Sequence, residues 1–261
     1  EGRRQPKPVK EFVQADILEY GNFSFYAIDL NRGKNIANYK GKVPLIPASV
    51  MKIVTSATAY EVLGEDFKLE TKLLYQGKIS DKGVLNGDIF IQGGGDPTLG
   101  SNGIDKKQDE FLKEWILAVK KAGIKEVKGD IVVLDDMFGY EGISGKWLWE
   151  DMGTDYAPIT NGISIFDNLY TIYLKSDNEK VIVEKVVPNI KGLTFDNKVT
   201  ISENGEKDIY VRGVPFDNNR ILRGVMPKNK TVEIDSDIPD PAMFLGEYLK
   251  ENLTKYGIKV S

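Results

Sequence analysis

The chain of 261 residues contains no cysteine and no histidine. It therefore cannot form a disulfide, and it cannot bind a metal ion through thiolate or imidazole groups. A chain of this length can instead bury a sizeable apolar core, in one large domain or two of ordinary size. The same absence excludes a cysteine nucleophile and a Ser-His-Asp triad. Any general base for hydrolysis must then be Lys, Asp, Glu or Tyr.

Composition and charge place the chain among soluble globular proteins. Apolar residues make up 41%, charged residues 28%, and the net charge is only -4. The first ten residues are basic, but no single-sign field covers the chain, and we expect no nucleic-acid partner. No apolar run approaches the roughly 18 residues of a membrane-spanning helix. The first residues hold no apolar signal segment, so we expect a soluble chain from which a leader has been removed.

Residue patterns divide the chain into helical and β-rich parts. Residues 22–30 and 35–40 are β-rich runs around a turn that contains glycine, so they predict a hairpin. Residues 49–64 carry apolar side chains at helical spacing and end at a glycine, which predicts a buried helix. From about Phe67 short β-rich runs follow, interrupted by one amphipathic helix from Gln108 to Ala122. A second amphipathic helix is predicted from Asp240 to about Tyr256. We predict a mixed α+β fold.

The sequence Ser49-Val50-Met51-Lys52 is the candidate for nucleophilic catalysis. Residues three apart share one helix face, so the Lys52 amine can reach the Ser49 hydroxyl and act as its base. At a helix N-terminus, free backbone N–H groups and the helix dipole favour a developing oxyanion. A lone S-x-x-K pair arises by chance in a chain of this length, and a capping serine with a lysine beside it would explain it equally well.

The surroundings of this pair resemble those of a known enzyme family. A Pro-Ala pair precedes Ser49 and a long helix follows an N-terminal hairpin, as in the penicillin-recognising acyl-serine enzymes. Further ordered segments resemble the D-alanyl-D-alanine carboxypeptidase/endopeptidase family of penicillin-binding-protein-4 type, peptidase family S13. These segments are FIQGGGDPTLG (90–100), GDIVVLDDMF (129–138), WLWEDMG (147–153) and DPAMFLGEYLKENLTKYGI (240–258). The resemblance spans most of the chain.

The resemblance implies a split transpeptidase-like domain with a large, mostly β insertion. Residues 1–66 would hold the N-terminal part with the S-x-x-K helix, 67–239 the insertion, and 240–261 the return to the transpeptidase-like domain. The resemblance also aligns Asp135 with an acid of the insertion that faces the cleft, which makes Asp135 a candidate substrate contact.

Two motifs of the family are not where the resemblance requires them. The family places an S-x-N motif and a K-[TS]-G motif after the terminal helix, whereas this chain stops at Ser261 and contains no Lys-Thr-Gly or Lys-Ser-Gly. We therefore expect an N-terminal portion of the enzyme that is inactive alone. Ser176-Asp177-Asn178 matches S-x-N in letters, but it lies between two β-rich runs, where it predicts a hairpin turn.

Three other motifs have structural explanations that we prefer. The run Gly93-Gly94-Gly95-Asp96-Pro97 lacks the Gly-Lys-Ser/Thr of a phosphate loop, so we expect a turn in which Asp96 caps backbone groups. Asp135 and Asp136 are adjacent at the end of a strand, where their side chains point apart, and no other ligand cluster accompanies them. Trp147 and Trp149 are expected to anchor the core of the insertion, with stacking on a sugar as the alternative.

Together these features predict a serine-type D-Ala-D-Ala carboxypeptidase or endopeptidase of the bacterial cell envelope. The enzyme would act on peptidoglycan stem peptides and cross-links through a Ser49 ester, with Lys52 as base, and β-lactams would acylate the same serine. No metal or organic cofactor is implied. The alternative is a non-catalytic fragment that binds peptidoglycan or a partner, and a β-lactamase is weaker because such enzymes lack a large β insertion. Self-association, or association with the missing C-terminal segment, would cover exposed apolar faces.

Overall fold

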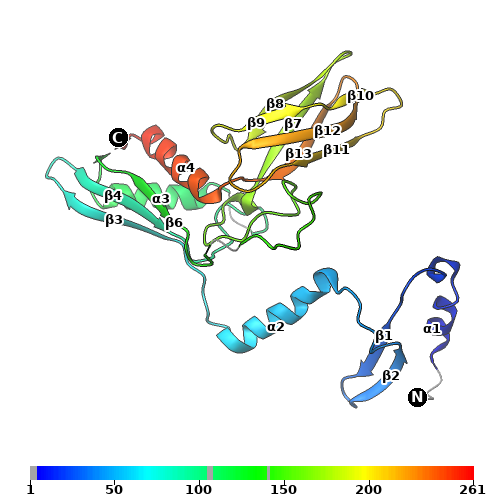
Figure 1. Ribbon diagram of the computed structural model, residues 1–261. Coiled ribbons are helices and arrows are strands. Elements are labelled where there is room, and N and C mark those ends of the chain that lie inside the picture. Colours follow the sequence, from blue (N-terminus) through cyan, green and yellow to red (C-terminus); the bar gives the residue numbers. More distant parts are fainter. Residues whose placement is uncertain (1–4, 105–107, 140–141) are drawn as a thin grey trace. The chain divides into compact units, whose positions relative to one another are not determined.

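The computed structural model describes residues 5–104, 108–139 and 142–261, and it confirms the mixed α+β fold (Figure 1). The chain separates into two compact units, residues 1–67 and 68–261, and each is described by itself. In the described residues, no helix is long and apolar enough to cross a lipid bilayer.

Unit 1 contains the predicted hairpin. Strand β1 (Phe25–Asp29) pairs antiparallel with β2 (Lys34–Tyr39), which confirms the two β-rich runs and the turn between them. The short helix α1 (Lys7–Phe12) precedes them. Phe23 joins the two parts, because its ring lies 4.8 Å from that of Phe12 and 6.0 Å from that of Tyr39, measured between centroids. Edge and offset ring contacts of this kind add to the burial of apolar surface.

Helix α2 (Met51–Leu63) completes unit 1 and confirms the helix expected over residues 49–64. It ends at Gly64, whose φ of 82° lies in the left-handed region. The prediction that this helix is buried is wrong: no residue of α2 is buried, and Ile53 is 70% and Val62 73% exposed. The apolar spacing indicates a helix face that can be buried, but unit 1 offers nothing large enough to cover it.

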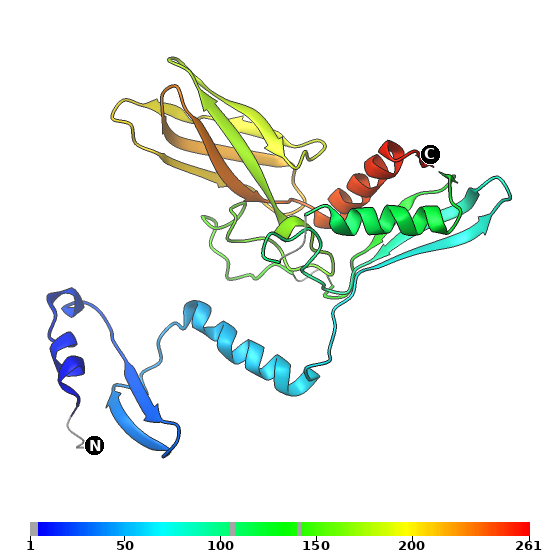
Figure 2. The same ribbon diagram turned by 180° about the vertical axis from the view of Figure 1, so that it is seen from behind.

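The first part of unit 2 is a five-stranded sheet with two helices packed on it. In this sheet β3 and β4 are antiparallel, whereas β5 and β6 run parallel to β4, and β14 runs parallel to β5. The strands are β3 (Lys72–Ile79), β4 (Val84–Gln92), β5 (Glu126–Val127), β6 (Ile131–Leu134) and β14 (Lys259–Val260). Figures 1 and 2 show α3 (Glu110–Lys121) and α4 (Pro241–Lys255) on the same side of it.

Both helices bury one apolar face, as their residue spacing predicts. From α3, Leu112, Ile116 and Val119 enter the core cluster that also contains Ile89 and Ile91 of β4. Each helix is followed by a glycine with positive φ, at positions 123 and 257. The carboxylate of Asp240 accepts a hydrogen bond from the Met243 backbone N–H at 2.9 Å and so caps the start of α4.

The second part of unit 2 consists of two further sheets, which lie against each other in Figure 1. One sheet has the order β13-β7-β8, and the other has β10-β12-β11 with β9 also paired to β12. Their strands are β7 (Leu169–Ser176), β8 (Val181–Val187), β9 (Thr194–Asn197), β10 (Thr200–Ser202), β11 (Asp208–Arg212), β12 (Asn219–Pro227) and β13 (Thr231–Asp237). Alternate residues point inward, such as Ile172 and Leu174 from β7 and Leu222 from β12.

A buried ion pair connects these two sheets. Arg220 of β12 donates from Nη2 to Oδ1 of Asp237 in β13 at 2.9 Å, and the two side chains are 0% and 1% exposed. Arg220 also donates from Nη1 to the Asp217 carbonyl at 2.7 Å. Burial raises the pKa of Asp237, and the positive charge of Arg220 opposes that shift. Neither charge can return to water without opening the sandwich.

Replacing one partner of this pair should destabilise the fold. The variant Arg220→Met leaves the Asp237 carboxylate buried and unpaired, so its free energy of unfolding should fall by about 3–5 kcal/mol in urea denaturation. The matched control is Arg223→Met, which breaks a partly exposed pair with Asp196 at 2.6 Å and should lower the free energy of unfolding clearly less. Equal losses in the two variants would contradict this account.

Candidate active site

Ser49 and Lys52 meet at the beginning of α2. Lys52 Nζ donates a hydrogen bond to Ser49 Oγ at 2.9 Å. Ser49 lies in a 3₁₀ turn, Ala48–Val50, that leads directly into the helix, and Ala48 has a positive φ of 46°. A positive φ is uncommon for alanine, and it sharpens the turn that presents the serine. The three-residue spacing therefore gives the geometry that sequence analysis predicted, whereas the catalytic role of the pair stays a prediction.

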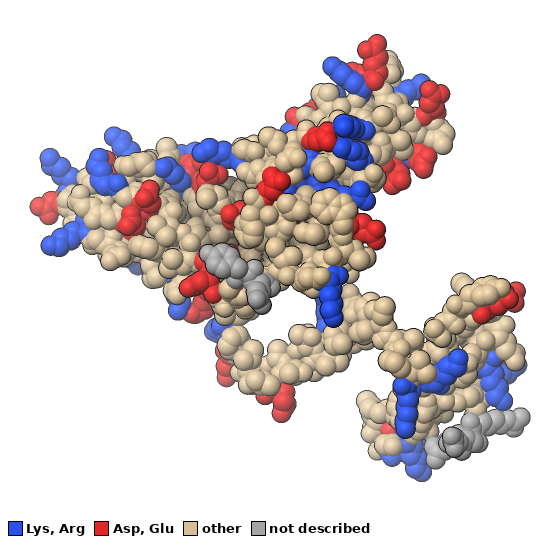
Figure 3. Space-filling model, in the orientation of Figure 1, with Lys and Arg blue, Asp and Glu red and all other residues tan. Residues whose placement is uncertain are grey.

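The surroundings of this pair are open. Both residues are exposed, and Figure 3 shows a surface over α2 that is mostly free of charged side chains except near its ends. The first backbone N–H groups of a helix lack intrahelical partners, so they can donate to an anion beside Ser49. The site thus holds a hydroxyl, an amine and the positive end of a helix, which together suit acyl transfer.

Asp135 lies at the end of β6 in unit 2 and is partly buried. Its Oδ1 accepts a hydrogen bond from the Ile163 backbone N–H at 3.0 Å, so the carboxylate fixes the loop that carries Ile163. Burial raises the pKa of Asp135; the N–H groups of Ile163 and Gly162 oppose the shift, and the charges of Asp240 and Asp136 add to it.

Three carboxylates share one cavity of about 340 Å³ beside this strand. Asp135, Asp136 and Asp240 line it, together with apolar groups of Ile143 and Phe216. Sequence analysis did not predict that Asp240 and Phe216 line this cavity. It interpreted Asp240 only as the start of a helix. Within the ranges that the structure describes, no cluster of three or more acidic side chains is arranged to hold a metal ion. The cavity therefore offers negative charge beside an apolar wall.

The S-x-N triplets of this chain are turns. Ser176-Asp177-Asn178 joins β7 to β8, and Ser176 Oγ donates to the Pro227 carbonyl at 2.7 Å, which confirms the predicted hairpin turn. Sequence analysis missed a second triplet, Ser202-Glu203-Asn204, which a search for the motif would have found. It begins at the last residue of β10, and Ser202 Oγ donates to Oδ1 of Asn204 within the turn.

The glycine run at 93–95 is also a structural turn, as predicted. Asp96 Oδ1 accepts from the Thr98 backbone N–H at 2.9 Å and from Thr98 Oγ1 at 2.7 Å. A Cβ on Gly94 would lie 2.1 Å from the Glu70 carbonyl oxygen, so only glycine fits there.

The prediction that both tryptophans anchor the core is wrong for Trp149. Its side chain is 55% exposed, and the neighbouring Leu148 is 57% exposed, whereas Trp147 is partly buried. The segment is a series of turns rather than a strand, so alternate residues need not point inward. Stacking of Trp149 on a sugar stays an untested alternative.

Comparison with known proteins identifies the family. The sequence model of the D-Ala-D-Ala carboxypeptidase 3 (S13) family matches residues 6–261. The chain belongs to this S13 family. The resemblance found in the sequence is thereby confirmed, although no part of the match assigns a role to an individual residue.

Several S13 relatives show the extent of the match. D-alanyl-D-alanine carboxypeptidase DacB from Haemophilus influenzae is 26% identical over 247 residues, which is 93% of this chain and 50% of that protein. D-alanyl-D-alanine carboxypeptidase from Actinomadura sp. (strain R39) is 26% identical over 263 residues, 97% of this chain and 47% of that protein. The chain thus spans about half the length of these curated S13 relatives.

Solved structures agree with this S13 assignment. The crystal structure of penicillin binding protein 4 (dacB) from Haemophilus influenzae has a TM-score of 0.71 at 25% identity, over 90% of this chain and 51% of that one. A structure of the same protein complexed with a β-lactam has a TM-score of 0.65 at 24% identity, over 91% and 50%, and shows likeness of fold.

The two directions of pKa shift in this S13 chain can be measured in one titration. By NMR of the side-chain carboxyl carbons, Asp135 should titrate above the ordinary value of about 3.9, because it is partly buried. Asp177 should titrate below it, because the Glu179 and Lys180 N–H groups donate to its charged form. Because the pKa of Asp135 is higher in the folded than in the unfolded chain, this group stabilises the fold fully at pH values below the unfolded pKa. That contribution to the free energy of unfolding is lost as the pH rises through the folded-state pKa. The reverse order of the two pKa values would contradict the structure.

Proposed function

We propose that this S13 chain carries the nucleophile and base of a serine-type D-Ala-D-Ala carboxypeptidase or endopeptidase. The observation behind the proposal is the 2.9 Å hydrogen bond between Lys52 Nζ and Ser49 Oγ at the start of α2. Membership of the S13 family and the names of the curated relatives support the reaction class. The substrates are the D-Ala-D-Ala ends of peptidoglycan stem peptides and the cross-links that join them.

The proposed reaction proceeds in two steps. Ser49 Oγ attacks the carbonyl carbon of the D-Ala-D-Ala peptide bond while Lys52 accepts the serine proton. The carbon–nitrogen bond breaks, the proton passes to the departing amine, and the peptide stays as an ester on Ser49. Water then adds to the ester carbon, the ester C–O bond breaks, and the shortened peptide leaves while Ser49 regains its proton. A β-lactam forms the same ester when its ring amide opens.

Lys52 must be neutral to accept the proton. In the structure Lys52 donates a hydrogen bond to Ser49, and no acidic side chain among the described residues forms a salt bridge with Lys52. The chain has no histidine, and Lys52 is the proposed base because its Nζ lies 2.9 Å from Ser49 Oγ.

Asp135 is the proposed substrate contact in unit 2. Its cavity holds three carboxylates beside apolar groups, which suits a positively charged or N–H-bearing part of a peptide. The Ile163 N–H donates to Oδ1 and holds the carboxylate at the edge of the cavity, where such a ligand would meet it. This role accounts for a carboxylate that stays partly buried with no salt-bridge partner in the described part of the chain.

The remaining parts of the proposal concern organisation and place. We propose that residues 1–66 and 240–261 belong to a transpeptidase-like domain and 67–239 to its insertion. In the structure α4 packs on β6 and lies in the same compact unit as the proposed insertion.

The enzyme would work outside the cytoplasm, in the bacterial envelope, with no cofactor. Without a K-[TS]-G sequence, these 261 residues alone would not turn over substrate.

The pair can be tested by mutation in the full-length protein. Ser49→Ala should abolish labelling by a fluorescent penicillin, and Lys52→Ala should lower the acylation rate by at least about a thousandfold, as expected when nucleophile and base act as a unit. Lys52→Arg should not restore the rate, because a guanidinium stays protonated at neutral pH.

The matched control is Ser56→Ala, which changes another serine of the same helix and should leave labelling intact. Near-normal acylation in Lys52→Ala would overturn the assignment of the base. A protein that binds cross-linked peptide while Ser49 never becomes labelled would instead favour the non-catalytic alternative.

A further inference from the structure

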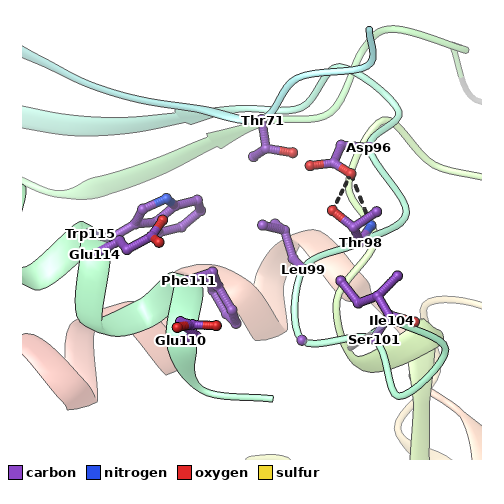
Figure 4. Close-up of a pocket in the computed structure, with 11 residues that line it drawn as sticks. Thr71, Asp96, Thr98, Leu99, Ser101, Ile104, Glu110, Phe111, Glu114 and Trp115 are labelled. Atoms are coloured by element: carbon purple, nitrogen blue, oxygen red, sulfur yellow. Dashed lines mark hydrogen bonds between the residues drawn. The ribbon is translucent and has the colours of Figure 1, made fainter. Parts of the chain in front are cut away.

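A cavity of about 210 Å³ lies beside the first turns of α3, and none of the residues assigned above to catalysis or to the Asp135 cavity lines it. Figure 4 shows its three walls: the loop that runs from Asp96 to Ile104, the N-terminal half of α3, and Thr71 just before β3. Sequence analysis gave this region only a structural role, as a glycine-rich turn followed by an amphipathic helix.

The loop wall of the cavity is fixed in place by a neighbouring turn. The Asp167 carboxylate accepts from Ser101 Oγ at 2.5 Å and from the Asn102 backbone N–H at 3.2 Å. The Phe166 N–H donates to the Leu99 carbonyl at 2.8 Å. Phe166 and Asp167 both have positive φ, a conformation that is costly for residues other than glycine and that persists only where contacts enforce it. These contacts hold Leu99, Ser101 and Asn102 of the loop wall in place.

The charge of the lining is negative. Asp96, Glu110 and Glu114 line the cavity, and no lysine or arginine is among its lining residues in the described part of the chain. Glu110 and Glu114 lie one helical turn apart on α3, where like charges repel each other. Oδ1 of Asp96 accepts from the backbone N–H and the hydroxyl of Thr98, and among the described residues no hydrogen bond reaches its other oxygen. A bound cation would relieve this excess of negative charge.

One polar atom at the cavity lacks a partner. Thr71 Oγ1 is buried and has no hydrogen-bond partner among the described residues. Figure 4 shows the Thr71 hydroxyl and the Asp96 carboxylate turned toward the same gap. A buried hydroxyl without a hydrogen bond is unfavourable. Because Thr71 Oγ1 is itself covered, the Asp96 carboxylate is the acceptor that a ligand in the cavity can reach. A primary ammonium carries three N–H donors and no acceptor, which suits a carboxylate.

The rest of the lining is apolar and aromatic. Phe111 and Trp115 meet edge to face, with ring centroids 5.4 Å apart, and Leu99 and Ile104 close the opposite side (Figure 4). Aromatic rings attract ammonium groups and pack well against methylene groups. At about 210 Å³ the cavity is smaller than sites for drug-sized ligands, which start near 300 Å³, so it suits one short chain.

We propose that this cavity binds a primary alkylammonium group, either a lysine-type side chain of a peptide or a free diamine. The ammonium donates to Asp96, its methylene chain contacts Phe111 and Trp115, and Glu110 and Glu114 supply further negative charge. The inference does not depend on the proposed chemistry of Ser49, because no residue of the catalytic pair takes part.

The test is an NMR titration of the 261-residue chain, followed at the Trp115 indole N–H. Nα-acetyl-lysine amide and 1,5-diaminopentane are the two ammonium probes, and Nα-acetyl-norleucine amide is the uncharged control. At least one ammonium probe should shift the Trp115 signal in a saturable way at millimolar concentration, and norleucine amide should not. Saturation by the diamine alone would assign the cavity to free amines, and saturation by acetyl-lysine amide would assign it to lysine side chains.

Variants identify the site. Asp96→Asn keeps an oxygen that can accept from Thr98 but removes the charge, and it should weaken binding at least about tenfold, as should the double variant Glu110→Gln/Glu114→Gln. The matched control Glu203→Gln changes an exposed acid in a distant turn and should bind like the parent chain. Thermal unfolding of each variant monitors the fold. Equal binding of norleucine amide, no saturable shift with either amine, or unchanged affinity in both folded variants would overturn the proposal.

Discussion

The apolar layer between the two helices and the five-stranded sheet is the contact on which unit 2 depends. Leu245, Leu249 and Leu253 of α4 are 0% exposed, and they belong to the same core cluster as Ile89 and Ile91 of β4. In a chain without disulfides or thiolate and imidazole metal sites, burial of such side chains is the main source of stability, at about 25 cal/mol per Å² of apolar area. The Asp135 cavity and the cavity beside α3 both lie on elements that this layer fixes.

Unit 1 differs, because its proposed catalytic pair forms within one helix turn and its helix is exposed. The Ser49–Lys52 pair is formed by the local geometry of one helix turn and needs no core beneath it. The apolar side chains of α2 stay exposed in the structure, although their spacing would suit burial. A local motif can thus form its hydrogen bond while its helix lacks a covering layer.

Sequence analysis predicted the parts of the fold that depend on local patterns. The hairpin, the three long helices and the turn at Ser176 follow from spacing, caps and turn residues, and the structure confirms them. Burial was harder to predict, because it depends on what packs nearby: α2 and Trp149 are exposed. The Asp135 cavity combines residues far apart in sequence, such as Asp136, Phe216 and Asp240, which no local pattern joins. For the same reason the sequence did not reveal Thr71 and Trp115 as walls of one cavity.

The central claim is that Ser49 is the nucleophile of an acyl-serine enzyme. The most direct measurement is mass spectrometry of the peptides released by proteolysis after the full-length protein reacts with a β-lactam. The account predicts one covalent adduct, with the mass of the intact β-lactam, on the Ser49 side chain. An adduct on another residue, or an unmodified Ser49 in a protein that still hydrolyses D-Ala-D-Ala peptides, would contradict it.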